Sequence, residues 1–337
     1  MEVSDSKLPK FLNTPNKQIQ RAKKLVATQL GSPVVQASRP TFQGFFSRTI
    51  SLTLKDGREI GVQYRLEDVD VESFLAARVS LGPIVPDFGI LEDEELKAEG
   101  VWTYWMTWLP GKMWKDGASG MGEAGRLAVC LSLGRVFSKG CIMTASGPQS
   151  SADTVKNKIR PHLEAILASP QAEMAPFKST IQGFLGDIHR LDDLPLWVSH
   201  FDLNALNVLV DDECEVTGLI DWEFSTPLPF GVGFGRIHSL AGGYSRGEFY
   251  MGSRFEDAER GFWWNLFLGM EDLMRVKLEG MADVIQLAVM VGTVMDSFYL
   301  DGDGSAQPAG VTVKALPRFL TYRIPLVRGK DESPYSS

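Results

Sequence analysis

The chain has 337 residues, 44% of them hydrophobic and 23% charged, which are proportions of an ordinary globular protein and exclude a disordered or fibrous one. The formal net charge of −8 argues against nucleic acid as a partner, because such binding draws its affinity from Lys and Arg on phosphates. No apolar run approaches the roughly 20 residues that span a bilayer, the N-terminal segment does not resemble a secretion signal, and the three cysteines lack metal or redox spacing. We therefore expect a cytoplasmic protein with no membrane partner; nothing in the sequence indicates an oligomeric state.

The first third of the chain has the pattern of a small β-rich unit. Thr14 and Pro15 are typical of a helix start, and apolar residues then recur at helical spacing over 15–30. Alternating residues on both sides of Lys55-Asp56-Gly57 predict a β-hairpin. A helix follows over 71–81, then strands near 84–91 and 99–108, and the acidic run 92–95 is most simply a solvated turn.

After Leu109-Pro110-Gly111 the pattern becomes helical, and we place the boundary between two lobes there. Helices are expected over 178–191, 254–277 and 281–297, and a short hairpin is expected where two apolar runs flank Asp211-Asp212-Glu213. The predicted fold is α+β with two lobes, comprising an N-lobe of residues 1–108, a larger mainly helical C-lobe of residues 109–330, and a disordered tail at 331–337.

Three oxygen-bearing side chains are expected to converge around that short hairpin. Asp202 and Asn207 share one loop five residues apart, and the hairpin returns the chain to Asp221. Phosphoryl transfer needs a carboxylate to orient or deprotonate the attacking hydroxyl, and oxygen ligands that hold magnesium on the nucleotide phosphates. Any one of these residues alone would more often be structural, but their joint spacing favours this chemistry.

The segment HFDLNALNVLV and the later LIDWE resemble the catalytic and metal segments of the aminoglycoside phosphotransferase family, which read roughly HGDLxxxNhL and hIDWE. Phe201 replaces the usual glycine, and the segment PFGVGFGRIHSLAG is similar to divergent fungal members that act on small molecules. The resemblance covers roughly 40–300 and implies a protein-kinase-like fold that uses ATP and Mg²⁺. It implies that Asp202 is the catalytic base, that Asn207 and Asp221 hold magnesium, and that His200 bonds to the backbone. The reaction implied is transfer of the γ-phosphoryl group to a hydroxyl of a small molecule.

The nucleotide-binding side departs from the family pattern. Gln63 takes the position of the usual basic residue on the third strand, and Arg65 lies two residues on, facing the same side. Arg65 is either a phosphate contact or an ion-paired strand residue, and the helix carboxylate is either Asp70 or Glu72. The phosphate loop holds the single glycine Gly44, with Ser47 after it, and the hinge strand would place adenine against the backbone from Met106 to Leu109.

Two other functions fit parts of the sequence. Because the third strand and the phosphate loop match the family's nucleotide-binding pattern poorly, the protein could instead have a kinase-like fold that serves as a binding or regulatory module. His200, Asp202 and His238 also match the residue types of a two-histidine, one-carboxylate iron site. That triad needs a β-rich scaffold, whereas this region of the sequence is predicted to be rich in helices. The acceptor is unidentified; Glu256, Asp257 and Glu259 could face a cationic one, but an exposed helix face explains these acidic residues equally well.

Overall fold

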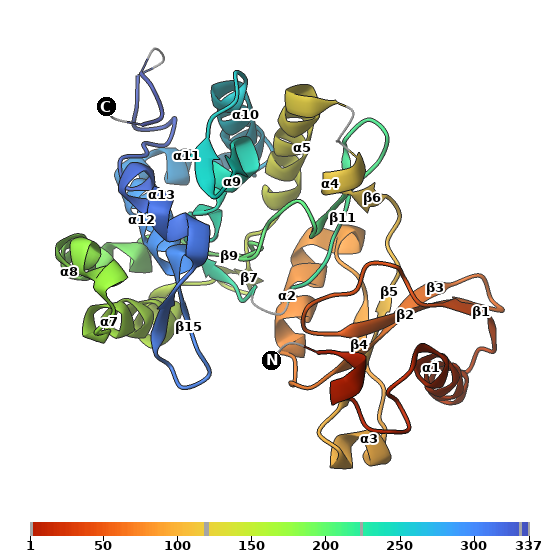
Figure 1. Cartoon of the computed structure of the whole chain (residues 1–337). Helices are drawn as coiled ribbons and strands as arrows, with labels where there is room; N and C mark the ends of the chain where they lie inside the picture. The colour runs from red at the N-terminus through yellow and green to blue at the C-terminus, as the bar shows by residue number, and fades with distance from the viewer. Residues whose placement is uncertain (1–2, 118–120, 223–224, 330–331, 336–337) are drawn as a thin grey trace.

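The computed structural model describes residues 3–117, 121–222, 225–329 and 332–335. A β-rich part occupies the first third of the chain, and helices make up most of the remainder (Figure 1). The short connection that follows β5 leads from one part to the other.

The β-rich part is a five-stranded antiparallel sheet with strand order β1-β2-β3-β5-β4. Its strands are β1 (Val34–Ser38), β2 (Arg48–Leu54), β3 (Glu59–Arg65), β4 (Phe88–Ile90) and β5 (Trp102–Thr107). The predicted hairpin is β2–β3, where Gly57 donates its N–H to Leu54 in the turn and has φ of 87°, a conformation that favours glycine. The strand expected near 84–91 is shorter than predicted, because Gly82–Ile84 form a 3₁₀ turn before β4 begins.

Three helices accompany this sheet (Figure 1): α1 (Pro15–Gln29), α2 (Val71–Leu81) and α3 (Glu94–Ala98). The helices expected over 15–30 and 71–81 are α1 and α2, and Thr14 accepts a cap hydrogen bond from Lys17 N at 3.5 Å. The interpretation of 92–95 as a solvated turn was wrong. Asp93 caps α3, its side chain is 4% exposed, and it accepts from Arg21 Nε at 2.6 Å.

The helical part is built around α5 and α10, which pack closely against each other. A Cβ at Gly134 of α5 would lie 2.3 Å from the carbonyl oxygen of Phe262 on α10, so only glycine permits this approach. The longer helices are α5 (Gly122–Phe137), α7 (Arg160–Ala168), α8 (Lys178–Asp187), α10 (Phe255–Leu268), α11 (Asp272–Glu279), α12 (Ala282–Ser297) and α13 (Gly310–Phe319). The predicted helix over 254–277 is thus two helices, and that over 178–191 ends at Asp187 in a 3₁₀ turn.

Short elements connect these helices. They are α4 (Trp114–Gly117), α6 (Ala152–Thr154), α9 (Ile237–Ala241), and the paired strands β7 (Met143–Thr144) with β8 (Gly147–Pro148), β9 (Leu196–Trp197) with β12 (Leu228–Pro229), β13 (Gly243–Ser245) with β14 (Glu248–Tyr250), and β15 (Phe298–Leu300) with β16 (Ala306–Pro308).

The hairpin predicted around Asp211-Asp212-Glu213 is β10 (Val208–Val210) paired with β11 (Val216–Leu219). Strand β6 (Lys112–Met113) adds to β10 and makes a three-stranded sheet. Gly111 is needed before β6, because a Cβ there would lie 2.3 Å from Thr217 Oγ1. This small sheet joins the segment after β5 to the loop that holds Asp202.

The C-terminal segment packs on the helical part. Residues 332–335 lie within the tail that we expected to be disordered, yet Tyr335 is buried and its hydroxyl lies 2.5 Å from His238 Nδ1. Arg323 N donates to the Pro334 carbonyl at 2.8 Å.

Among the described residues, no single helix is long and apolar enough to cross a membrane. Helices α11 and α12 reach that length and composition only as a pair, and the pair is bent by 82°.

Candidate functional site

The loop between β9 and β10 is closed by the side-chain amides of two asparagines. Asn207 Nδ2 donates to the Asp202 carbonyl oxygen at 2.9 Å and to Asp202 Oδ2 at 3.1 Å. Asn204 Nδ2 donates to the same Asp202 carbonyl at 3.1 Å, and Asn204 Oδ1 accepts from Leu206 N. These bonds fix Asp202 beside Asn207, and within the described residues the Oδ1 atom of Asn207 accepts no hydrogen bond and can face a cation.

The β10–β11 hairpin brings Asp221 to this loop. Val208 pairs with Leu219, and Ile220 N donates to the Asn207 carbonyl at 3.0 Å, so the chain leaves the hairpin directly beside Asn207. Asp221 has φ of 68°, in the left-handed region that Asp tolerates better than most residues. Burial raises the pKa of the Asp221 carboxyl, the charge of Asp202 adds to the rise, and Arg65 opposes it. Two carboxylates that raise each other's cost of ionisation in this way attract a cation.

His200 has a structural role, because it contacts the residues on both sides of Asp221. Its Nε2 lies 2.7 Å from the Ile220 carbonyl and therefore carries the proton that it donates, and its ring packs on Trp222 with centroids 4.7 Å apart. Burial lowers the pKa of His200 to about 4, so the ring is neutral at pH 7.

The iron-site hypothesis was wrong. His238 is buried and stacks on Phe319 at 4.1 Å, while its Nδ1 is bonded to Tyr335. No group of three His, Cys, Asp or Glu residues that could hold a metal occurs in the described part of the chain.

The strand residues that face the nucleotide in our interpretation lie together on β3. Gln63 Oε1 accepts from Arg65 Nη1 at 3.4 Å. Arg65 is buried, and its positive charge acts to lower the pKa of Asp221. The sheet and the loop therefore interact electrostatically. Asp70 caps α2, accepting from Glu72 N and Ser73 Oγ, whereas the Glu72 side chain is exposed.

The other nucleotide-side residues lie in the β1–β2 loop, on β5 and in the connection after β5. Gly44 and Ser47 are in the β1–β2 loop, where Gly44 O accepts from Arg48 and the Ser47 hydroxyl is buried near Thr49. Met106 is on β5 and pairs with Gly61 and Phe88, while Leu109 is buried in the connection to β6.

A partly buried chain of ion pairs that includes Asp202 was missed from the sequence. Arg236 Nη1 lies 3.1 Å from Asp202 Oδ1, and Arg236 Nη2 lies 2.5 Å from Asp296 Oδ1 on α12. The Asp296 side chain is only 9% exposed, and burial raises its pKa to about 6 against the attraction of Arg236. The one available signal was an acidic residue at the end of an otherwise apolar helix pattern.

Close packing at two glycines brings Arg236 near Asp296. A Cβ at Gly292 of α12 would lie 1.9 Å from the Val232 carbonyl oxygen, and one at Gly235 would lie 2.5 Å from Gly292 C. The segment before α9 therefore lies directly on α12. Asp296 is one helical turn beyond Gly292, so the guanidinium reaches it from this contact.

A cavity of about 650 Å³ lies beside the loop, within the size range of small-molecule sites. Arg236, Asn204 and Ala205 form one side of it. Its remaining lining comes from α4, the start of α5, α9, the β13–β14 region, the start of α10 and the start of α13.

The acidic residues after Arg254 do not line this cavity. Asp257 pairs with Arg254 at 3.0 Å, and Glu256 lies 3.9 Å from Arg260. Glu259 is fully buried against Arg328 Nη2 at 2.6 Å. Our suggestion that they face a cationic acceptor was wrong for Glu259, whose charge is neutralised inside the core.

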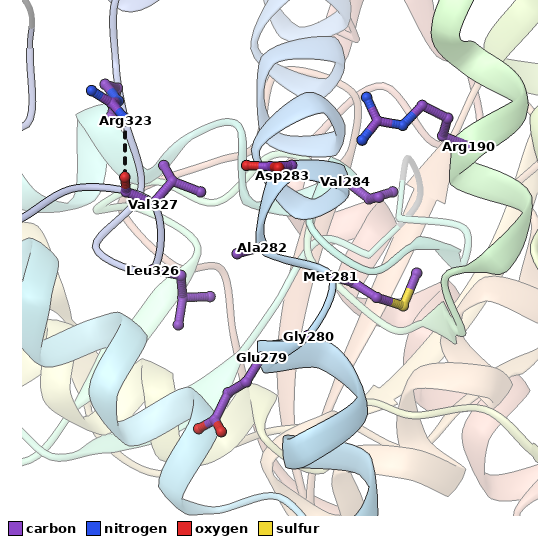
Figure 2. A pocket seen from close by; sticks show the side chains of 10 residues that line it. All are labelled: Arg190, Glu279, Gly280, Met281, Ala282, Asp283, Val284, Arg323, Leu326 and Val327. Atoms are coloured by element: carbon purple, nitrogen blue, oxygen red, sulfur yellow. Dashed lines mark hydrogen bonds between the residues drawn. The ribbon is translucent and has the colours of Figure 1, made fainter.

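A second hollow, of about 300 Å³, lies at the junction of α11 and α12. Figure 2 shows Arg190 and Arg323 on opposite sides of the start of α12, with Arg323 donating to the Val327 carbonyl. Neither Asp202 nor Asp221 lines this hollow, so it is separate from the loop described above.

Residues 65–252 match the model of the phosphotransferase enzyme family, and this is more than half of the chain. The chain belongs to that family. The matched region contains the Asp202 loop, the β10–β11 hairpin, Asp221 and Arg236. The family resemblance predicted from the motifs is therefore confirmed.

Solved structures of phosphotransferases share the fold. Plasmodium vivax ethanolamine kinase is 12% identical, with a TM-score of 0.56 over 90% of this chain and 88% of that one. Aminoglycoside 2'-phosphotransferase-IIIa, in its GDP complex, is 14% identical, with a TM-score of 0.50 over 83% of this chain and 89% of that one. These likenesses confirm the predicted two-lobe, protein-kinase-like α+β fold. No curated protein matches the chain in sequence.

Proposed function

We propose that this phosphotransferase family member transfers the γ-phosphoryl group of ATP to a hydroxyl of a small molecule. The proposal rests on the hydrogen bonds that join Asp202 to Asn207 and Asn207 to Ile220, the residue directly before Asp221. In this proposal residues 1–108 hold the nucleotide, and residues 109–330 supply the catalytic loop, the metal ligands and the acceptor cavity.

Asp202 is the proposed base. Its carboxylate accepts the proton of the acceptor hydroxyl as that oxygen attacks the γ-phosphorus, and the bond from the γ-phosphorus to the bridging oxygen breaks to release ADP. Arg236 and Asn207 hold its two oxygens in place. Catalysis here is mostly positioning, because the protein forms no covalent bond with the phosphoryl group.

The residues present fit a magnesium ion. The Asp221 carboxylate and the Asn207 Oδ1 atom are hard oxygen donors, and phosphate oxygens and water would complete the shell. Burial raises the pKa of Asp221, and a bound divalent cation would favour its ionised form. Bound magnesium supplies positive charge that neutralises the phosphates during transfer.

On the nucleotide side, Arg65 or Gln63 would contact the phosphates, Gly44 and Ser47 would lie over them, and Met106 to Leu109 would face adenine. Between the two candidate carboxylates, Asp70 is occupied as a helix cap, so Glu72 remains the proposed partner for the basic strand residue.

Thermal unfolding tests nucleotide binding. A ligand at a hundredfold excess over its Kd stabilises the folded state by about 2.7 kcal/mol, so Mg-ATP should raise the unfolding midpoint by a few degrees. ATP with EDTA should raise it much less, and Mg-GTP gives the base preference. In Asp221→Ala the magnesium-dependent part should vanish. Asp212→Ala is the matched control, because it removes an 83% exposed carboxylate from the same hairpin.

Activity is tested by ADP release. Asp202→Asn should keep the Mg-ATP shift and lower transfer by about 10²-fold or more, as expected for loss of a positioned base. A parent protein that shows no nucleotide shift with or without Mg²⁺ would instead be a binding or regulatory module. A shift of equal size in EDTA would mean that nucleotide binds without its metal, which contradicts the proposed mechanism.

A further inference from the structure

The 650 Å³ cavity presents more cationic than anionic side chains. Its charged lining residues are Lys115, Glu123, Arg126, Arg236 and Arg254. Among the described residues that line it, Glu123 is the one carboxylate. The charge of an acceptor therefore depends on which of these groups are already neutralised.

Two of the arginines are paired with carboxylates. Arg236 lies between Asp202 and Asp296, and Arg254 is paired with Asp257 at 3.0 Å. These two guanidinium groups offer little net charge to a ligand.

The carboxylate of Glu123 is hydrogen-bonded to other residues of the protein. Glu123 Oε1 accepts from Ser253 N at 2.9 Å, and Oε2 accepts from Arg254 N at 3.1 Å and from the Ser253 hydroxyl. Backbone and hydroxyl donors hold this side chain in one position. Its function is to tie the start of α5 to the segment before α10, so it is a poor receptor for an amine.

Arg126 donates its hydrogen bonds to neutral groups, although its charge also acts on Glu123, whose pKa it helps to lower. Its Nη1 donates to the carbonyl oxygens of Leu240 and Gly242, which are neutral, and its guanidinium lies 5.6 Å from the centre of the Trp114 ring. In the described part of the chain no carboxylate pairs with it within 4 Å. These contacts hold the guanidinium in place, and within the described residues its Nε and Nη2 form no hydrogen bond, so both can donate to a ligand.

Lys115 is tied to the catalytic loop. Its backbone N–H donates to the Ala205 carbonyl at 2.9 Å, three residues from Asp202. The side chain is exposed and, within the described residues, forms no ion pair. The start of α5 at Gly122 also lines the cavity, and the partial positive charge of a helix N-terminus acts in the same direction.

We propose that the acceptor is a hydroxylated organic acid, whose carboxylate binds Arg126 and Lys115 while its hydroxyl lies at Asp202. This inference rests on the proposed phosphotransferase function. The lining also includes Tyr244, Phe255 and Val311, which suit an apolar or aromatic body between the two polar groups.

Three probe molecules of similar shape and different charge test whether the cavity prefers an anionic, a neutral or a cationic acceptor. They are p-(hydroxymethyl)benzoate, p-(hydroxymethyl)benzamide and p-(hydroxymethyl)benzylamine, titrated calorimetrically into the full chain with Mg²⁺ and a non-hydrolysable ATP analogue. The benzoate should bind about tenfold or more tighter than the other two, because a charge-assisted hydrogen bond contributes that much affinity. Lys115→Glu should lower benzoate affinity about tenfold and leave benzamide binding unchanged.

Lys139→Glu is the matched control, since it makes the same charge change at an exposed residue of the same lobe that does not line the cavity. It should leave benzoate affinity unchanged. Tighter binding of the benzylamine, equal binding of all three probes, no binding of any, or equal effects of the two lysine variants would each overturn the proposal. Arg126→Lys, which keeps the charge, should retain the preference for benzoate.

The same samples separate this inference from the proposed function. If Mg-ATP produces no thermal shift while benzoate binds preferentially, the phosphotransferase proposal fails and the anion site stands. If Mg-ATP shifts the midpoint and benzoate has no preference, the acceptor assignment fails and the phosphotransferase proposal stands.

Discussion

Replacing Asp296 with Asn should stabilise the protein while impairing phosphoryl transfer. Burial raises the pKa of Asp296 from 3.8 to about 6 despite the attraction of Arg236, so ionisation of this carboxyl opposes folding. A rise of about two units corresponds to about 3 kcal/mol. Because the folded pKa is above the unfolded one, the cost is absent below about pH 4, grows as the pH rises through 6, and is then constant.

Urea unfolding, followed by tryptophan fluorescence, measures this difference. Asp296→Asn should gain up to about 3 kcal/mol over the parent at pH 7 and 8, and about half of that at pH 5. The rate of phosphoryl transfer should fall, because Arg236 loses the partner that fixes its position beside Asp202.

Asp283→Asn is the control, since Asp283 is exposed in the first turn of the same helix, and its loss should cost about 0.5 kcal/mol. A parent that is more stable than Asp296→Asn at pH 8 would show that the attraction of Arg236 exceeds the burial cost, and would refute the reasoning. Unchanged kcat in a stabilised variant would remove the positioning role of Asp296.

Three other changes test separate contacts. Arg65→Ala should weaken Mg-ATP binding, measured by calorimetry, by about tenfold to a hundredfold if its guanidinium contacts phosphate; unchanged affinity would make it a purely structural residue. Gly292→Ala should lower both unfolding free energy, by about 2 kcal/mol or more, and kcat, because the added Cβ would lie 1.9 Å from a carbonyl oxygen of the segment that carries Arg236. Gly183→Ala on α8, where a Cβ meets nothing within 4 Å, should instead be neutral or stabilising, and equal losses in both glycine variants would contradict the packing argument. Arg328→Met should cost about 3–5 kcal/mol in urea unfolding by leaving Glu259 buried without its ion pair, and a loss under 1 kcal/mol would show that water reaches Glu259.

The local elements were the most predictable part of the fold. The N-cap at Thr14, the turn at Gly57 and the hairpin that precedes Asp221 all depend on residues within a few positions of one another. Predicted boundaries were wrong where a short break interrupts the pattern, as at Gly269 between α10 and α11. Periodicity continues across such a break, so the sequence pattern alone does not show it.

Contacts between distant segments could not be predicted. The glycine approach between Val232 and Gly292, and the pairing of Glu259 with Arg328, join residues at least 60 positions apart. An acidic residue has the same appearance in the sequence whether it is solvated or buried with a partner, which is why Asp93 and Glu259 were misinterpreted.

The sequence by itself determined the family, and it predicted that Asp202, Asn207 and Asp221 lie near one another, because one loop and one short hairpin connect them by local spacing. Only the tertiary structure decided what surrounds them. Arg236 reaches Asp202 because α12 packs against the segment before α9, and the cationic cavity is formed by elements from five regions of the chain that meet only in the folded state. Spacing along the chain specifies neighbours within a few residues, whereas charge pairing and cavity shape depend on how whole helices pack.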